Sequence, residues 1–198
     1  MLSMKYEDKI NDHYNELSSI YGYSKAGIGW KSDKLNLRYE KFCKYMPIQN
    51  SNVLDFGGGL AHFYIYLIQK KINFNKYFYY DINKNFQIFL KKKYQSNKIN
   101  FLSSYPIKKK FDFIVMNGVY NYNIKNNDDI IRKDIKKLFK ICKKCIGFSF
   151  LNNDVDYREK HLFYHNEDQL IKYSKKISNK IIVDKTFGRF ETFIFLYK

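Results

Sequence analysis

The sequence predicts an α/β protein with a seven-stranded, mostly parallel sheet, helices on both faces of that sheet and a helical lid at the N-terminus. From residue 52 onward, short β-branched or aromatic runs alternate with longer segments of helical period, which is typical of parallel strands joined by crossover helices. The predicted strands are apolar almost throughout, as a sheet covered on both faces requires. Two apolar runs about a glycine at the end of the sequence predict an antiparallel hairpin, so we expect the last strand to run against the others.

The first fifty residues show no strand pattern and are predicted to form one or two helices joined by the loop YGYSKAGIGWKSDKLN. We expect residues 1–50 to act as a lid over one structural unit formed by residues 51–198. No linker rich in serine or proline separates the two parts, and the 198 residues include only two prolines. A second independent domain is therefore not expected.

Five parallel strands are predicted at residues 51–56, 76–82, 99–102, 111–117 and 146–150, and helices at 61–71, 83–94, 127–144 and 166–177. The helix at 127–144 has the clearest signals. Asp128 and Asp129 lie at its N-terminal end and lysines gather toward its C-terminal end, as the helix dipole favours. Its apolar side chains recur at helical spacing and form one stripe that can pack on the sheet.

The net charge of +17, from 36 lysines and arginines against 19 aspartates and glutamates, raises nucleic acid or an anionic membrane as a partner. Only four of these cations are arginines, although sites for phosphates and bases favour that side chain. Lysine is abundant together with asparagine, isoleucine, tyrosine and phenylalanine, all of which have A/T-rich codons. Gene composition therefore explains most of the charge and we expect no specific nucleic-acid partner, but an anionic substrate stays open.

The three cysteines, Cys43, Cys142 and Cys145, cannot all pair within one chain, which favours a reducing compartment and a cytoplasmic protein. The start, MLSMKYEDKINDHY, lacks the apolar stretch of a secretory signal, and no segment approaches the length of a membrane span. The CKKC spacing at residues 142–145 resembles a metal or redox motif but has no second CxxC and no nearby histidine pair. We expect these thiols to pack in the core, and predict no metal site.

The segment NVLDFGGGLAHF carries the strongest functional signal. A strand ends at Asp55, and the glycines at 57–59 lead directly into a helix, where missing side chains let the backbone approach a ligand. Asp81 ends the next strand, where such folds use a carboxylate to hold a ribose diol. These features predict an adenosine-containing cofactor at the carboxyl ends of the strands. The dinucleotide fingerprint is not met, because its third glycine would fall at His62.

The alternative pattern, D-x-G-x-G followed by a small residue, is met by Asp55, Gly57, Gly59 and Ala61, and here the chain resembles the class I S-adenosylmethionine-dependent methyltransferases. The resemblance covers residues 52–198 and implies a Rossmann-like fold with S-adenosylmethionine as the cofactor. The stretches GIGWKSDKLNLRYE and DYREKHLFYHNEDQL are similar to a subgroup of small bacterial methyltransferases, several of which belong to surface-glycan and small-metabolite pathways. That similarity does not identify the substrate.

The resemblance implies a role for each residue of the motif. Gly57 and Gly59 would approach the methionine moiety, and Asp55 would hold its amino group, directly or through water. Asp81 would accept both ribose hydroxyls, and Ile82 would pack on the adenine. The alternative for the two aspartates is that they only cap strand ends, which would leave the glycine loop between them unexplained.

Further positions follow from the same resemblance. Ser103 stands where many members place an acid near the adenine amino group, which puts that contact in doubt. Asn117 and Gly118 occupy the position that faces the transferred methyl. Trp30 and Arg38, in the predicted lid, would cover the cofactor and pair with its carboxylate. Packing is the alternative for Trp30, and a salt bridge is the alternative for Arg38.

A general base is optional for methyl transfer, because the sulfonium already activates the methyl carbon and positioning supplies much of the rate. For a hydroxyl acceptor, histidine is the first side chain to consider. We predict His161 as the base, with His165 as the second choice and Tyr164 lining the acceptor pocket. Structural hydrogen bonds are the alternative for both histidines. Asp154 and Asp156 are weaker candidates for substrate contact.

The sequence thus predicts a methyltransferase that acts on a small molecule or a glycan precursor, with a phosphorylated or nucleotide-linked sugar as one anionic example. A nucleic-acid methyltransferase is the first alternative, supported by the lysine runs at 91–93 and 108–110 but lacking an Asn-Pro-Pro-Tyr type signature. A non-catalytic cofactor-binding protein and an aminopropyl transferase are the others. The oligomeric state stays open.

Overall fold

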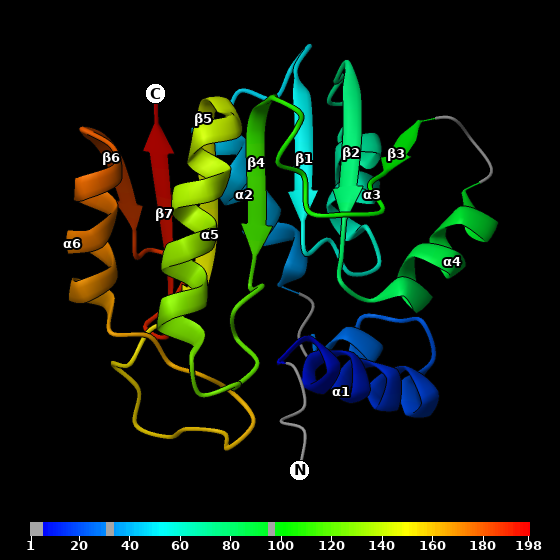
Figure 1. Cartoon of the computed structure of the whole chain (residues 1–198), viewed down its shortest axis with the longest axis horizontal. Coiled ribbons are helices and arrows are strands. Elements are labelled where there is room, and N and C mark those ends of the chain that lie inside the picture. The colour runs from blue at the N-terminus through cyan, green and yellow to red at the C-terminus, as the bar shows by residue number, and fades with distance from the viewer. Residues whose placement is uncertain (1–5, 31–33, 95–97) are drawn as a thin grey trace.

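The computed structural model describes residues 6–30, 34–94 and 98–198, which form one sheet with helices on both faces (Figure 1). The strands are β1 (Asn52–Phe56), β2 (Lys76–Tyr80), β3 (Ile99–Phe101), β4 (Phe111–Asn117), β5 (Cys142–Leu151), β6 (Lys180–Asp184) and β7 (Glu191–Tyr197). Their order across the seven-stranded sheet is β3-β2-β1-β4-β5-β7-β6. Strands β1 to β5 pair in parallel, whereas β7 pairs antiparallel with both β5 and β6. The predicted fold class, with its antiparallel last strand, is confirmed.

The helices cover the two faces of the sheet and the carboxyl ends of its strands. They are α1 (Tyr6–Tyr21), the short 3₁₀ helix η1 (Ala26–Ile28), α2 (Leu35–Tyr45), α3 (His62–Gln69), α4 (Lys84–Lys93), α5 (Asn127–Ile141) and α6 (Glu167–Ile177). Successive strand residues face opposite sides, so Val53 joins the core cluster of α2 and α3 while Leu54 joins that of α5 and α6. In Figure 1, α5 and α6 lie in front of the sheet, and α2 and α3 lie behind it.

The two N-terminal helices have different positions. Helix α1 buries no residue and lies below the carboxyl ends of the strands in Figure 1, where a lid would lie. Helix α2 buries Leu35, Tyr39 and Phe42, whose spacing places them on one helix face, and they pack in the same core cluster as α3 and β7. Helix α2 is therefore a core helix, and the lid role expected over residues 1–50 stays a prediction.

The junction of α5 and β5 differs from the prediction. The helix ends at Ile141 rather than residue 144, and Cys142 already has extended backbone angles. Strand β5 therefore takes up the CKKC segment, and Cys142 and Cys145 pair with Phe111 and Phe113 of β4 across a register shift. Pairing with a neighbouring strand thus overrides the helical period at this point. Both thiols are buried and free, as the packing interpretation expects.

Among the described residues, no helix combines the length and the apolar character that crossing a bilayer requires. Within the same residues, no group of three or more histidine, cysteine, aspartate or glutamate side chains could hold a metal ion.

Candidate functional site

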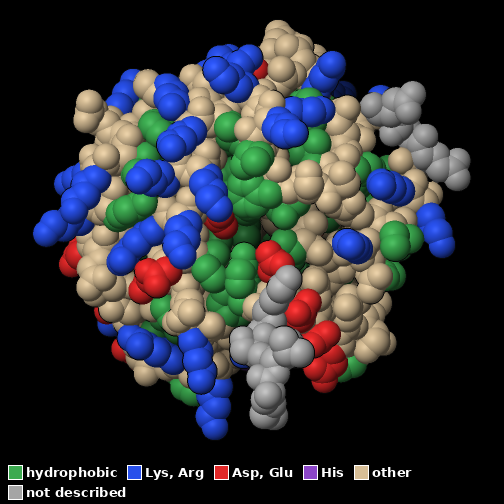
Figure 2. Space-filling view, in the orientation of Figure 1, with side chains coloured by type: hydrophobic (Ala, Val, Ile, Leu, Met, Phe, Trp, Pro, Cys, Tyr) green, Lys and Arg blue, Asp and Glu red, His purple; other side chains and the backbone are tan. Residues whose placement is uncertain are grey.

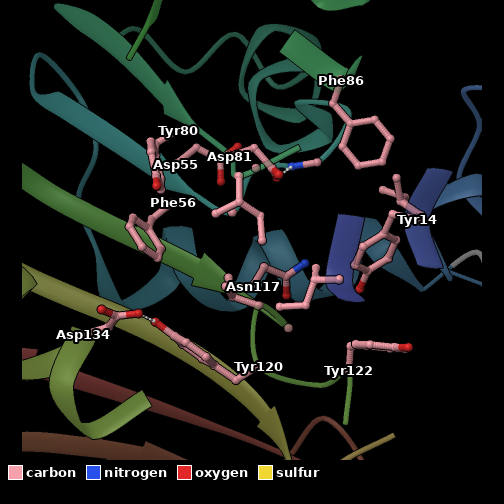
Figure 3. A pocket seen from close by; sticks show the side chains of 18 of the residues that line it. Tyr14, Asp55, Phe56, Tyr80, Asp81, Phe86, Asn117, Tyr120, Tyr122 and Asp134 are labelled. Carbon is pink, nitrogen blue, oxygen red and sulfur yellow. Dashed lines mark hydrogen bonds between the residues drawn. The ribbon is translucent and has the colours of Figure 1, made fainter. Parts of the chain in front are cut away.

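A pocket opens at the carboxyl ends of β1, β2 and β4, between the sheet and α1 (Figure 3), and encloses a cavity of about 150 Å³. Eight of the residues predicted for cofactor binding line it: Trp30, Asp55, Gly57, Gly59, Asp81, Ile82, Asn117 and Gly118. Near the centre of Figure 2, apolar side chains line a hollow with acidic side chains beside it and lysines or arginines farther out. The structure therefore brings most of the sequence-predicted residues to one place.

The turn between β1 and α3 can be built only with glycine at its centre. Gly57 and Gly59 have positive φ values of 69° and 53°, which residues with a Cβ rarely adopt. A Cβ on Gly58 would lie 2.6 Å from Oδ2 of Asp55 and 2.8 Å from Cε2 of Tyr79. Gly58, which the motif treated as variable, is thus as constrained as its neighbours, because the turn folds back against Asp55.

The close approach at Gly58 leads to a testable expectation. The variant Gly58→Ala must displace the Asp55 carboxylate or the Tyr79 ring, so it should weaken binding of S-adenosylhomocysteine about tenfold or more. Calorimetric titration measures the affinity, and circular dichroism checks that the variant is folded. An unchanged affinity in a folded variant would show that the turn can relax without affecting the pocket.

Asp55, at the end of β1, is a buried carboxylate with one hydrogen-bond donor. The Tyr77 hydroxyl from β2 donates to its Oδ2 at 2.5 Å. Burial raises the pKa of Asp55 to about 7, against a lowering by the Tyr77 hydrogen bond and a smaller raising by Asp81. A group with a positive charge or several donors in the pocket would stabilise its ionised form.

Asp81 follows β2 and closes the glycine turn from the other side. Its Oδ2 accepts a hydrogen bond from the Gly59 N–H and its Oδ1 accepts one from the Asn83 N–H, both at 2.8 Å, and Figure 3 shows it beside Asp55. Burial raises the pKa of Asp81 to about 6, although these hydrogen bonds lower it. The backbone thus fixes this carboxylate at the position predicted for the ribose acid.

The raised pKa of Asp55 predicts a pH dependence of stability. A carboxyl whose pKa is higher in the folded state stabilises the fold below its unfolded pKa of 3.8, and this contribution is lost as the pH rises through about 7. The variant Asp55→Asn has no carboxyl to titrate, so it should not lose this stability. The free energy of unfolding of the variant, relative to that of wild type, should therefore rise by on the order of a few kcal/mol between about pH 5 and about pH 8. Urea denaturation of both proteins at the two pH values measures the difference. Asp129→Asn, an exposed change on α5, is the control, and an equal gain there would contradict the assignment.

Trp30 and Arg38 are close to each other, but only Trp30 lines the pocket. The guanidinium carbon of Arg38 lies 4.4 Å from the Trp30 ring centroid and 4.5 Å from that of Phe187. Arg38 Nε and Nη2 donate to the Glu191 carboxylate, with the shortest N···O distance 2.7 Å, and both side chains are almost fully buried. Arg38 therefore has an internal carboxylate partner on β7, while its buried Nη1 has no hydrogen-bond partner among the described residues. The pairing expected with a cofactor carboxylate stays a prediction.

Asn117 and Gly118, at the end of β4, are held by a residue of β5. The Ser149 hydroxyl donates to Asn117 Oδ1 at 3.1 Å and accepts from the Gly118 N–H at 3.0 Å. A Cβ on Gly118 would lie 3.0 Å from the Trp30 ring, so that ring closes over the end of β4. Buried Ser149, which no sequence motif marks, therefore fixes this wall of the pocket.

The three side chains predicted for catalysis lie elsewhere. His165 is fully buried and bonds through Nδ1 to Asp128 at 2.8 Å, so the structural alternative describes it. His161 is exposed and lies 3.6 Å from the Glu159 carboxylate. Tyr164 lines a separate surface groove that also holds Asp154 and Asp156. None of the three belongs to the described lining of the main pocket, so their catalytic roles stay a prediction.

Two other predictions concern the edge of the site. Ser103 is exposed and is not among the described lining residues, so its contact with the adenine stays a prediction. His161 lies near the pocket only indirectly: its ring is 5.9 Å from that of His13, which stacks on the lining residue Tyr122 at 4.2 Å.

Sequence reasoning missed most of the aromatic lining. The missed aromatic side chains include Tyr6 and Tyr14 of α1, Tyr80 of β2, and Tyr105 and Tyr120 of the loops before and after β4. The acid Asp134 of α5 was missed as well. Tyr80 directly precedes Asp81 and could have been found by its place at a strand end. The others come from segments whose convergence on the pocket only the fold reveals.

No protein-family model matches this chain, and no curated protein matches its sequence. Solved structures do resemble it. Magnesium protoporphyrin IX methyltransferase from Synechocystis PCC 6803, with bound S-adenosylmethionine, superposes with a TM-score of 0.70 at 14% identity over 100% of this chain and 99% of that one. A SAM-dependent methyltransferase from Leishmania major gives a TM-score of 0.74 at 12% identity, over 98% of this chain and 83% of that one. A chain of the Pnkp1/Rnl/Hen1 RNA repair complex gives a TM-score of 0.67 at 14% identity, over 84% of this chain and 42% of that one. The fold is therefore that of SAM-dependent methyltransferases.

Proposed function

We propose that this protein is an S-adenosylmethionine-dependent methyltransferase that acts on a small-molecule acceptor. The observation that carries the proposal is the pair of carboxylates, the buried Asp55 and the half-buried Asp81, on either side of a glycine turn in the main pocket. Both have a raised pKa, so both would gain from a ligand that offers an ammonium group or hydroxyls. S-adenosylmethionine carries both kinds of group, and the residues present fit it.

Different residues of the pocket would bind different parts of this cofactor. Asp81 would accept the ribose hydroxyls, Asp55 would face the amino group, and Ile82 would pack on the adenine. Trp30 would lie over the sulfonium, where a cation–π contact is worth about 0.5–2 kcal/mol. These roles follow the family resemblance, and their support here is that all four side chains line one cavity.

When bound, S-adenosylmethionine supplies an electrophilic methyl group. A lone pair of the acceptor would take this methyl group, the sulfur would leave as the neutral thioether of S-adenosylhomocysteine, and the proton of the acceptor would pass to solvent. Asn117 and Gly118, held by Ser149, would form the wall that orients the acceptor. No histidine occurs among the described lining residues, so we propose that positioning and not a histidine base provides the rate.

A hydroxyl of a glycan precursor is the acceptor that the subgroup resemblance suggests, in a cytoplasmic setting. A pocket that α1 covers on one side supports a small molecule as the acceptor.

Calorimetric titration with S-adenosylmethionine and S-adenosylhomocysteine tests the proposal. We expect both to bind with dissociation constants on the order of micromolar. Adenosine alone should bind more weakly, since it lacks the amino acid part that Asp55 would face. Absence of binding by both ligands to the folded wild-type protein would overturn the proposed function.

A further inference from the structure

The pocket has a second part that the proposed cofactor roles leave unused. This part, called the aromatic arm below, is formed by Tyr6 and Glu7 of α1, Tyr80 of β2, Tyr105 and Tyr120 of the loops around β4, and Asp134 of α5. Figure 3 shows Asp134 and Tyr120 on the opposite side of the pocket from Tyr14 and Phe86. The arm therefore extends along the α5 side of the sheet.

Hydrogen bonds within the arm fix its one partly buried acid. The Tyr105 hydroxyl donates to Asp134 Oδ1 at 2.8 Å, and the Tyr120 hydroxyl donates to Asp134 Oδ2 at 3.1 Å. The Tyr80 and Tyr105 rings are in edge contact, with centroids 5.9 Å apart. Since the two hydroxyls bond to the same carboxylate, the rings surround Asp134 as a preformed group.

The charge of the lining contrasts with the charge of the chain. Although the net charge is +17, the described lining residues include Glu7, Asp55, Asp81 and Asp134 and no lysine, arginine or histidine. Lys137 lies with its Nζ 5.3 Å from the Tyr105 ring centroid but is exposed and not a lining residue. Two of these acids, Glu7 and Asp134, belong to the arm. Burial raises the pKa of Asp134, while the hydrogen bonds from the two tyrosines and the charge of Lys137 lower it. The arm thus has acidic side chains and no cation in its described lining, on a cationic protein.

The pKa values of the tyrosines in the arm are raised. Burial, and after it nearby acids that include Glu7 and Asp134, raise the pKa of Tyr6 and of Tyr80 to about 12. The pKa values of Tyr105 and Tyr120 are also raised, by burial and then by Asp134. All four rings therefore stay neutral at physiological pH and present their π faces without adding negative charge.

We infer that the aromatic arm binds a positively charged nitrogen group of a small amine, and that this amine, rather than an anionic sugar or the glycan hydroxyl named above, is the acceptor of the proposed methyl transfer. An ammonium nitrogen has no lone pair, so the nitrogen that takes the methyl group would first lose a proton to solvent. Neutral aromatic rings and carboxylates together form the environment that an ammonium group prefers, and an anion in the arm would meet Glu7 and Asp134 and no cation among the described lining residues. That the bound amine is a methyl acceptor rests on the proposed function. That the arm prefers a cation does not depend on it.

Three compounds of similar size and different charge test the preference. Phenethylamine, 2-phenylethanol and 3-phenylpropionate are titrated calorimetrically into the wild-type protein, with and without S-adenosylhomocysteine. We expect phenethylamine to bind about tenfold more tightly than the alcohol, and the carboxylate to bind least. Equal affinities, preference for the carboxylate, or no heat from any of the three would overturn the inference.

Variants locate the binding in the arm. Asp134→Asn keeps the size of the side chain and should weaken phenethylamine binding about fivefold or more while leaving the affinity for S-adenosylhomocysteine unchanged. Asp129→Asn removes one exposed carboxylate from the same helix outside the pocket and should change neither. Glu7→Gln, at an exposed position, serves if Asp134→Asn does not fold.

The two proposals can fail separately. Loss of S-adenosylhomocysteine affinity in Asp134→Asn would assign the arm to the cofactor and overturn the amine site alone. Failure of the wild-type protein to bind S-adenosylhomocysteine, with phenethylamine still bound, would overturn the proposed methyltransferase and keep the cation site.

Discussion

Asp81→Asn is expected to weaken binding of S-adenosylhomocysteine about a hundredfold. In the proposed complex, Asp81 accepts two ribose hydroxyls, and hydrogen bonds to a charged group contribute about 1.5 kcal/mol or more each, so losing both corresponds to about two orders of magnitude in affinity. The asparagine keeps an oxygen for one backbone N–H but places an NH₂ group where Gly59 or Asn83 now donates. Calorimetric titration measures the loss.

Asp112→Asn is the matched control for this change. Asp112 lies at the start of β4, at the opposite end of the sheet, and its Oδ2 also accepts a backbone N–H, that of Asn52, at 2.8 Å. It should leave the affinity unchanged. A similar loss in both variants would mean that the effect comes from general loosening of the sheet, and no loss in Asp81→Asn would contradict the ribose role.

Arg38→Met is expected to lower the free energy of unfolding by about 3–5 kcal/mol, because it leaves the Glu191 carboxylate buried without its cation. Arg38→Lys should recover only part of the loss, since an ammonium group cannot reproduce the forked contact with the carboxylate or lie flat between Trp30 and Phe187. Urea denaturation monitored by circular dichroism gives both values.

The double variant Arg38→Met/Glu191→Leu separates the two causes. If the loss comes from an uncompensated buried charge, the double variant should be more stable than Arg38→Met. Arg189→Met breaks ion pairs of Arg189 with Asp154 and Asp156 that are exposed to solvent, and it should change stability little. A double variant as unstable as the single one would show that packing of the guanidinium, and not its charge, is what matters.

The sequence predicted the part of the site whose residues lie close together along the chain. The glycine turn and the acids Asp55 and Asp81 follow strands that alternate with helices, so parallel pairing alone brings them to one edge. Ile82 is adjacent to one of these acids and was found for the same reason. The strands themselves were found because each is an apolar run bounded by polar residues.

Contacts between distant segments could not be predicted in this way. Arginine is a residue type that often binds carboxylate ligands. The partner of Arg38 in the structure is nevertheless Glu191, which lies 153 positions away, and no local pattern connects the two. Tyr105 and Asp134 meet across 29 positions for the same reason. The positions of the histidines at 161 and 165 relative to the pocket could not be predicted either, because they depend on bridges from this loop to Tyr122 and Asn152 that no local pattern indicates.

The position of β7 between β5 and β6 has a consequence for synthesis on the ribosome. The chain makes β5 first and β7 only after residues 152–190, so one long edge of β5 has no strand to pair with in the interval. That edge belongs to a strand whose residues 145–150 are all buried in the finished sheet, and such an edge can pair with other chains. Slow translation of residues 152–190 would therefore lengthen the time during which the nascent protein is prone to aggregate.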